Sequence, residues 1–241
     1  HPTLRRQRQM CIRDSALTAL ACAFYCTFTA RPSTNCMRGN GLPSVNFDEL
    51  LGPARWPQTH HARLHMLMAY FDRQRARLAA GDSLSRPITI RRHRAPAAWM
   101  DDWLGCTAPL LPLTVAPLHR SIDTAADHLR VDFANCCIGG AALAYGCVQE
   151  EIMFCCMPEL LITRLLCPLM RADEAIAVLG AERFADAEGY AGSLRFGGPV
   201  TDPAPDRSAI VAIDALDLRG SSLDQRSCLL YTSPSPRDRY G

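Results

Sequence analysis

The spacing of apolar residues predicts a long amphipathic helix in the first third of the chain. Four apolar side chains recur at helical intervals, at Leu64, Leu67, Met68 and Phe71. Together they would form a stripe about three turns long on one side of a helix. Gly81 follows the last turn and is typical of a helix end. The stretch 88–90 then alternates between apolar and polar residues, which predicts a short strand.

From residue 129 the pattern becomes that of an α/β protein. Leu129, Val131 and Phe133 alternate with polar residues and predict a half-buried strand that ends near residue 134. A helix is expected from about residue 148 and should end before Pro158, which can itself begin another helix. The apolar runs 175–179 and 210–213 are short enough for buried strands, whereas the proline-rich stretch 96–117 predicts an irregular, partly buried segment. Strand, helix and strand in this order indicate an α/β layer structure.

Composition narrows the class of protein only slightly. Hydrophobic residues make up 48% of the 241 residues and charged residues 21%, which indicates a globular chain. The formal net charge of +2 gives no reason to expect binding to nucleic acid. The 12 cysteines include vicinal pairs but no C-x-x-C motif, so we expect reduced, mostly buried thiols in an intracellular protein.

The two ends of the chain differ in character from its body. Residues 16–29 are apolar and follow basic residues, like a secretory signal, but are too short to span a bilayer. Residues 1–15 and 227–241 look like translated sequencing-adapter text. We therefore expect both to be non-native and the chain to be a fragment; ordinary disordered tails are the alternative.

Three acids are the first candidates for chemistry. Asp132 stands at the end of a predicted strand, and Glu150 and Glu151 stand at the start of the next helix. Such positions face one crevice in α/β sheets. Adjacent helical residues project about 100° apart, so the two glutamates cannot play the same part. Acids in a first helical turn more often simply stabilise the helix dipole, and the spacing alone favours that interpretation.

Taken together, these residues resemble the signature of the poly(ADP-ribose) glycohydrolases. Residues 131–135 read VDFAN, residues 139–141 read GGA where the family has three glycines, and QEE follows at 149–151 after a seven-residue spacer. The similarity continues through PEL at 158–160, EGYA at 188–191 and IVAIDAL at 210–216. The resemblance implies a partial macrodomain-like mixed sheet with helices at 119–226, preceded by a helical accessory region at 16–118.

Such enzymes cleave the ribose–ribose O-glycosidic bond of poly(ADP-ribose). The resemblance implies that Glu151 protonates the departing ribose oxygen and then activates water. By the same resemblance Glu150 and Asp132 would bind the ribose hydroxyls, with Asn135 beside them. Gln149 would contact the adenine end of the substrate.

Further binding residues follow from the same comparison. Tyr190 would stack near the adenine, and Ile122-Asp123 is similar to a pair that reads this base. Gly139 and Gly140 allow close approach of the backbone to a ligand, whose ribose or phosphate oxygens their N–H groups could hold. The resemblance implies no metal and no organic cofactor. It implies poly(ADP-ribose) on modified proteins as the partner, a monomer, and residence in the nucleus or cytoplasm.

Two departures from the family pattern leave alternatives open. Ala141 adds a methyl group where the family has its third glycine, and the family's second glycine-rich loop lies beyond the last native-looking residue, Arg226. The alternatives to a glycohydrolase are a macrodomain-like module that binds ADP-ribose without turnover and an inactive truncated product. Two other features, the histidines at 60, 61 and 65 and the basic run 91–94, are best interpreted as surface residues.

Overall fold

The computed structural model describes most of the chain between residues 9 and 215. The described residues are 9–10, 13–25, 42–43, 45–52, 57–82, 87–96, 99–109, 112–117, 121–122, 125, 128–201 and 209–215. Asp123, residues 1–8 and residues 227–241 lie outside this part, so the predictions made for them stay predictions.

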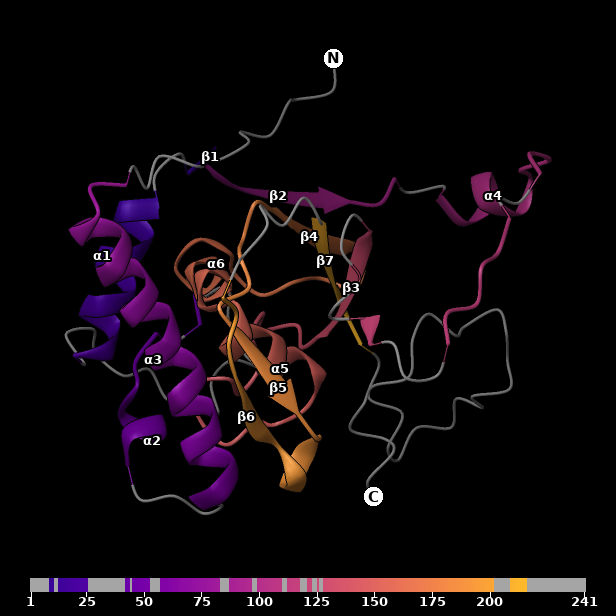
Figure 1. The fold of residues 1–241 in the computed structure, drawn as a ribbon. Coiled ribbons are helices and arrows are strands. Elements are labelled where there is room, and N and C mark those ends of the chain that lie inside the picture. The colour runs from indigo at the N-terminus through magenta and orange to yellow at the C-terminus, as the bar shows by residue number, and fades with distance from the viewer. Residues whose placement is uncertain are drawn as a thin grey trace.

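A five-stranded mixed sheet forms the centre of the fold. Its strands lie in the order β1 (Gln9–Met10), β2 (Ile88–Arg94), β4 (Glu174–Leu179), β7 (Ala209–Asp214) and β3 (Leu129–Ala134). Strand β3 pairs with β7 in parallel, with Asp132 opposite Ala212, and the other pairs are antiparallel. A separate hairpin consists of β5 (Ala185–Glu188) and β6 (Arg195–Pro199) (Figure 1). The predicted strands at 129–134, 175–179 and 210–213 are confirmed.

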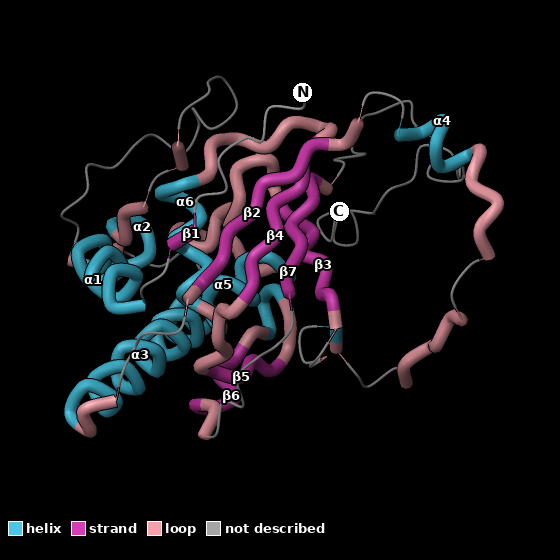
Figure 2. The backbone as a smooth tube through the Cα atoms, turned by 90° about the horizontal axis from the view of Figure 1, so that it is seen from above, coloured by secondary structure: helices cyan, strands magenta, loops and turns pink. Residues whose placement is uncertain are grey.

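The helices gather mainly on one side of this sheet. They are α1 (Arg13–Phe24), α2 (Asp48–Leu51), α3 (Pro57–Ala79), α4 (Trp99–Leu104), α5 (Gln149–Cys156), η3 (Pro158–Ile162), α6 (Thr163–Leu166) and η4 (Ala191–Ser193). Figure 2 shows α3, α5 and α6 on the same side of the strands, with α5 nearest to them. Helix α3 packs against α5 and against the β5–β6 hairpin. The predicted α/β class is therefore confirmed. Within the described residues, no helix is long and apolar enough to cross a membrane.

Helix α3 is longer than predicted and buries more polar residues than expected. Its inward residues are Thr59, His60, Ala62, Arg63, Met66, Leu67, Tyr70 and Gln74. The interpretation of His60 as a surface residue was wrong, because this residue is only 5% exposed. Met68, which the apolar stripe placed inside, is 41% exposed, whereas Leu67 is buried and Leu64 and Phe71 pack against the core. The stripe was therefore wrong only at Met68. Polar side chains such as Arg63 share the buried face because they find backbone partners there.

The buried face of β3 is also opposite to the expected one. Arg130, Asp132 and Ala134 are buried, whereas Leu129 is 63% exposed and Val131 and Phe133 are only partly covered. The polar face packs against α5, and Arg130 donates a hydrogen bond to Met157 Sδ. As a result, the carboxylate of Asp132 and the guanidinium of Arg130 lie inside the protein.

The segment around α4 lies apart from the sheet (Figure 1). It was predicted to be partly buried, but Trp103 and Leu113 are mostly exposed. That prediction is wrong for these residues, because aromatic content and prolines by themselves do not show whether a segment packs against the body.

The main core fills the space between the sheet and the helices. It includes Ile176, Val178, Ile210 and Ala212 from the strands and Phe154, Cys155, Cys156, Leu160 and Leu161 from α5 and η3. Helix α5 is buried on every side, so its two leading glutamates are carried into the interior with it. The structure thus places the acids on a rigid element rather than on a surface loop.

Candidate active site

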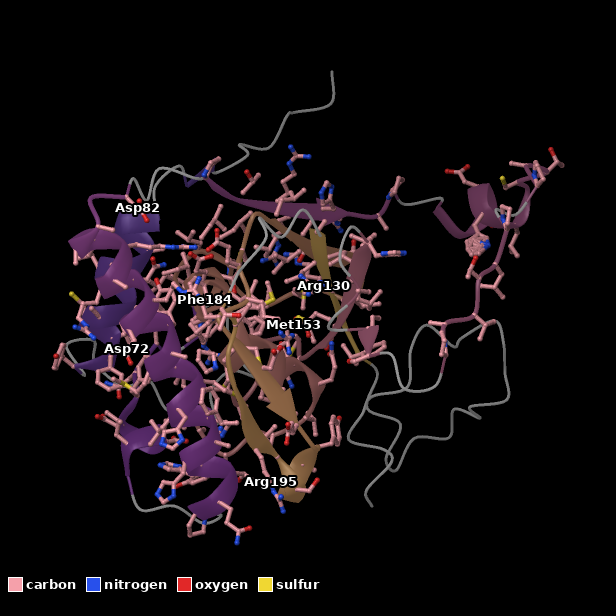
Figure 3. All side chains as sticks on the ribbon, viewed as in Figure 1. Asp72, Asp82, Arg130, Met153, Phe184 and Arg195 are labelled. Atoms are coloured by element: carbon pink, nitrogen blue, oxygen red, sulfur yellow. The ribbon has the colours of Figure 1, made fainter. Side chains whose placement is uncertain are left out.

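The carboxyl end of β3 and the amino end of α5 bring the three predicted acids together. Asp132 is 0%, Glu150 2% and Glu151 1% exposed. Figure 3 labels Arg130 on β3 and Met153 on α5, the two elements that carry these acids in the middle of the molecule. The sequence prediction that they share one site is consistent with this geometry, because Asp132 and Glu151 both act electrostatically on Glu150.

Backbone N–H groups hold the carboxylate of Glu150 from two sides. Its Oε2 accepts a hydrogen bond from Asn135 N at 3.0 Å and its Oε1 from Gly139 N at 2.6 Å. These bonds favour the ionised form, but burial opposes it more strongly, and Asp132 and Glu151 add like-charge repulsion. The balance raises the pKa of Glu150 well above its ordinary value of 4.5.

Glu151 is fixed by the loop that precedes its helix. Its Oε1 accepts a hydrogen bond from Ala141 N at 3.1 Å and its Oε2 from Val148 N at 3.0 Å. The second bond is the one that a glutamate at the third helical position makes to its N-cap residue. Glu151 therefore caps α5 and also reaches across to the glycine loop.

Glycines line the space around the two glutamates. Gly140 has φ +45°, and a Cβ built there would lie 2.5 Å from Glu151 Oε1 and 2.6 Å from Glu150 Oε2. A Cβ on Gly146 would lie 2.5 Å from Glu151 Cδ. A side chain at either glycine would therefore force the carboxyl groups of Glu150 or Glu151 to move. Gly146 was not identified from the sequence, because a single glycine in a loop carries no such signal.

The departure at Ala141 does not strain the backbone. Among the described residues other than glycine, Ala191 has a positive φ of +48°, whereas Ala141 does not have a positive φ. The Ala141 N–H donates to Glu151 in an ordinary conformation. The extra methyl group therefore occurs at a position that any L-residue can adopt.

Two buried arginines, Arg63 and Arg164, bind backbone carbonyls of the loop between β3 and α5. Arg63 of α3 donates to the carbonyls of Ala142, Ala144 and Gly146 at 3.3, 2.7 and 2.9 Å. Arg164 of α6 uses Nη1 to donate to the carbonyls of Ile138 and Gly140 at 3.0 and 2.9 Å. Sequence reasoning missed both residues, since an arginine inside an apolar helical pattern is normally interpreted as a surface residue.

Asn135 and Gln149 brace the elements of the site. Asn135 Oδ1 accepts from Cys137 N at 3.0 Å and so shapes the turn after β3. The Gln149 amide accepts from Phe133 N at 3.1 Å and donates to Val131 O at 3.2 Å. Gln149 thus ties α5 to the exposed edge of β3, in addition to any role toward a substrate.

The remaining predicted binding residues lie at the edges of the described site. Tyr190 is partly buried and directly precedes η4, which is joined to the loop before α5 because Ala191 N donates to Cys147 O at 3.1 Å. Ile122 is 40% exposed, and its predicted neighbour Asp123 is outside the described residues. The binding roles of Tyr190 and Ile122 therefore stay predictions.

Neither disulfides nor a metal-binding cluster accompany the acids in the described part of the chain. The eight cysteines placed there are all free thiols. No group of three or more histidine, cysteine, aspartate or glutamate side chains in that part could hold a metal ion.

A mixed sheet with helices and with buried acids at a strand's carboxyl end defines an α/β protein with a macrodomain-like site. Two family models match the sequence. The model described as poly(ADP-ribose) glycohydrolase, helical domain, matches residues 3–92, and the one described as poly(ADP-ribose) glycohydrolase, Macro domain fold, matches residues 100–228. The chain belongs to the poly(ADP-ribose) glycohydrolase family, and the resemblance seen in its sequence is confirmed.

Curated relatives support the same assignment. Poly(ADP-ribose) glycohydrolase 1 of Arabidopsis thaliana is 40% identical over 207 residues, which cover 82% of this chain and 36% of that protein. Probable poly(ADP-ribose) glycohydrolase 2 of the same plant is 31% identical over 82% of this chain and 39% of its own length. Poly(ADP-ribose) glycohydrolase 1 of Caenorhabditis elegans is 32% identical over 67% of this chain. The chain thus spans less than two fifths of the two plant relatives.

Proposed function

We propose that this protein hydrolyses the ribose–ribose O-glycosidic bonds of poly(ADP-ribose) and releases ADP-ribose. The observation that carries the proposal is the group of three buried carboxylates, Asp132, Glu150 and Glu151, two of which are held by backbone N–H groups of one loop. A structural helix cap requires one acid at the start of a helix, not three in the interior. Burial of three acids costs stability, and such a cost is typical of functional sites.

The proposed reaction uses Glu151 as general acid and then as general base. In the protonated form its carboxyl group gives the proton to the departing ribose oxygen as the bond to the anomeric carbon breaks. The resulting carboxylate then takes a proton from the water that attacks this carbon. The product is a free ribose hydroxyl on each side, and Glu151 ends in its starting protonation state.

The electrostatics of the acid group fit this role. Burial, together with the neighbouring Asp132 and Glu151, raises the pKa of Glu150. Glu150 therefore keeps its proton to a higher pH than a free glutamate, which supports a site that can hold a proton. Glu150 and Asp132 are proposed to bind the ribose hydroxyls, with Asn135, Gly139, Gly140, Gln149 and Tyr190 completing the binding surface.

The test is Glu151→Gln in the protein expressed from its complete open reading frame. Release of ADP-ribose should fall by about 10²–10⁴-fold, the usual worth of general acid–base catalysis. Glu49→Gln is the matched control, because Glu49 also lies in the first turn of a helix but is exposed. Wild-type release by Glu151→Gln would reject its assigned role. ADP-ribose binding without any release by the wild-type protein would instead identify a binding module.

The wider biological setting is proposed on the same basis. The partner would be poly(ADP-ribose) on modified proteins, acted on by a monomer in the nucleus or cytoplasm during the DNA damage response. Neither nucleic acid nor a membrane would be bound directly. Gel filtration of the protein at micromolar concentration tests the oligomeric state, and a dimer would contradict this part of the proposal.

A further inference from the structure

Two peptide groups connect Arg164 to the acid pair. The carbonyl of Ile138 and the N–H of Gly139 belong to one peptide unit; the carbonyl accepts from Arg164 Nη1 and the N–H donates to Glu150 Oε1. The carbonyl of Gly140 and the N–H of Ala141 belong to a second unit, which bonds Arg164 Nη1 and Glu151 Oε1 in the same way. Nη1 of Arg164 is therefore connected to Glu150 through one peptide and to Glu151 through the other.

The geometry of a trans peptide makes this arrangement directional. The C=O and N–H bonds of a trans unit point in opposite directions, and no cis peptide occurs among the described residues. A carbonyl turned toward Arg164 thus turns its N–H toward the carboxylate. The positive φ of Gly139, +83°, and of Gly140, +45°, lets these two units, which are separated by the 139–140 peptide, take the same orientation.

The charges reinforce the orientation. Arg164 is 5% exposed, and its cation polarises both peptides along the direction of their dipoles. Each N–H then becomes a stronger donor to the carboxylate on its far side. Glu150 is faced directly by Asp132 from β3 and by Glu151 from α5, whereas the Arg164 cation reaches it only through the 138–139 peptide.

We propose that Arg164 is a positioning residue, which acts through the 138–139 and 140–141 peptides to orient Glu150 and Glu151 and to stabilise the ionised form of Glu150. This role rests on the proposed function of the acids but is separable from it. Arg63 provides the comparison, because it binds three carbonyls of the same loop. Each of these carbonyls belongs to a peptide whose N–H group, in the described structure, donates to neither Glu150 nor Glu151.

The test is a titration of Glu150 in variants of these two arginines. Protein labelled with ¹³C at the glutamate carboxyl carbon is followed by NMR as a function of pH, and Glu150→Gln assigns the signal. In Arg164→Met the apparent pKa of Glu150 should rise by about one unit or more, because the peptide N–H loses its orientation. Arg164→Lys should restore the titration, since a single ammonium nitrogen can replace Nη1 at both carbonyls.

Arg63→Met is the matched control for simple loosening of the loop. It should lower Tm yet leave the Glu150 titration within about 0.3 unit of the wild type. Equal shifts in Arg63→Met and Arg164→Met would overturn the proposal, as would an unchanged titration in folded Arg164→Met. If the Met variant has no cooperative unfolding transition, Arg164→Gln replaces it, and an unchanged titration there overturns the proposal equally.

The titration does not depend on turnover. If Arg164→Met shifts the Glu150 titration but the wild-type protein releases no ADP-ribose, the proposed enzymatic activity is rejected and the positioning role of Arg164 stands. In an active protein, Arg164→Met should lower kcat by about 10²-fold with a smaller change in KM, because misplaced catalytic groups affect the transition state most.

Discussion

Replacing Gly140 by alanine should have two effects that can be measured separately. It should strain the backbone, and it should displace the carboxyl groups of Glu150 and Glu151. The new Cβ would lie 2.5 Å from Glu151 Oε1 and 2.6 Å from Glu150 Oε2, whereas a tolerable contact is above 3.0 Å. The two carboxyl groups must therefore move, each by a sizeable fraction of an ångström. Misplacement of a catalytic group by roughly 1 Å costs on the order of 10²-fold in rate.

The strain itself can be measured at another glycine. Gly81 has φ +73°, like Gly140 in the left-handed region, but a Cβ there would meet nothing within 4 Å. Alanine at either position costs about 1–2 kcal/mol for its positive φ. This corresponds to a fall in Tm of about 2–8 °C for a chain of this size.

The assay compares Gly140→Ala and Gly81→Ala in thermal unfolding and in release of ADP-ribose. Gly81→Ala should lose stability but keep its activity, whereas Gly140→Ala should lose about 10²-fold in activity as well. Equal activities in the two variants would refute the claim that close packing at Gly140 sets the positions of the carboxylates. A normal Tm for Gly81→Ala would refute the estimate of strain.

Three further predictions concern stability and thiol reactivity. Because the folded-state pKa of Glu150 is raised above its unfolded value of 4.5, the unfolding free energy should fall as pH rises from about 4.5 through the folded pKa, by at most about 1.4 kcal/mol per pH unit. Urea unfolding at a series of pH values should show a smaller slope in Glu150→Gln, and an identical slope would contradict the assignment. Ala191→Gly should raise the unfolding free energy by about 0.5–1 kcal/mol, because it relieves the strain of φ +48° at a modest cost in chain entropy; a loss of stability would show that the alanine methyl packs usefully. Burial raises the pKa of Cys155 to about 12, so iodoacetamide should label exposed Cys106 well before Cys155 in the native protein, and comparable labelling rates by mass spectrometry would contradict the burial of α5.

The site could be predicted from the sequence to the extent that its residues are local. Asp132 and the pair Glu150-Glu151 follow a strand and begin a helix, and such positions meet at one edge of an α/β sheet. The helix start near 148 and its end before Pro158 are also confirmed. Both depend on short-range rules for helix termini and proline, which the sequence carries directly.

The contacts that come from distant segments could not be predicted. Arg63 and Gly146 are 83 residues apart and meet only because α3 packs against α5. The buried face of β3 was misassigned, and the buried polar residues of α3 were missed, for the same reason. Periodicity shows that an element has two faces, but when one face carries partnered polar groups it does not show which face is buried.

The sequence by itself determined the family, the class of fold and the identity of the three acids, because each depends on residue types at fixed spacing. The tertiary structure decided how the acids are held. It placed Gly140 and Gly146 against the carboxylates and directed Arg164 onto two peptides whose N–H groups face Glu150 and Glu151. The reason is that orientation of a peptide or a carboxylate depends on partners from several elements, and those partners are neighbours only after the chain has folded.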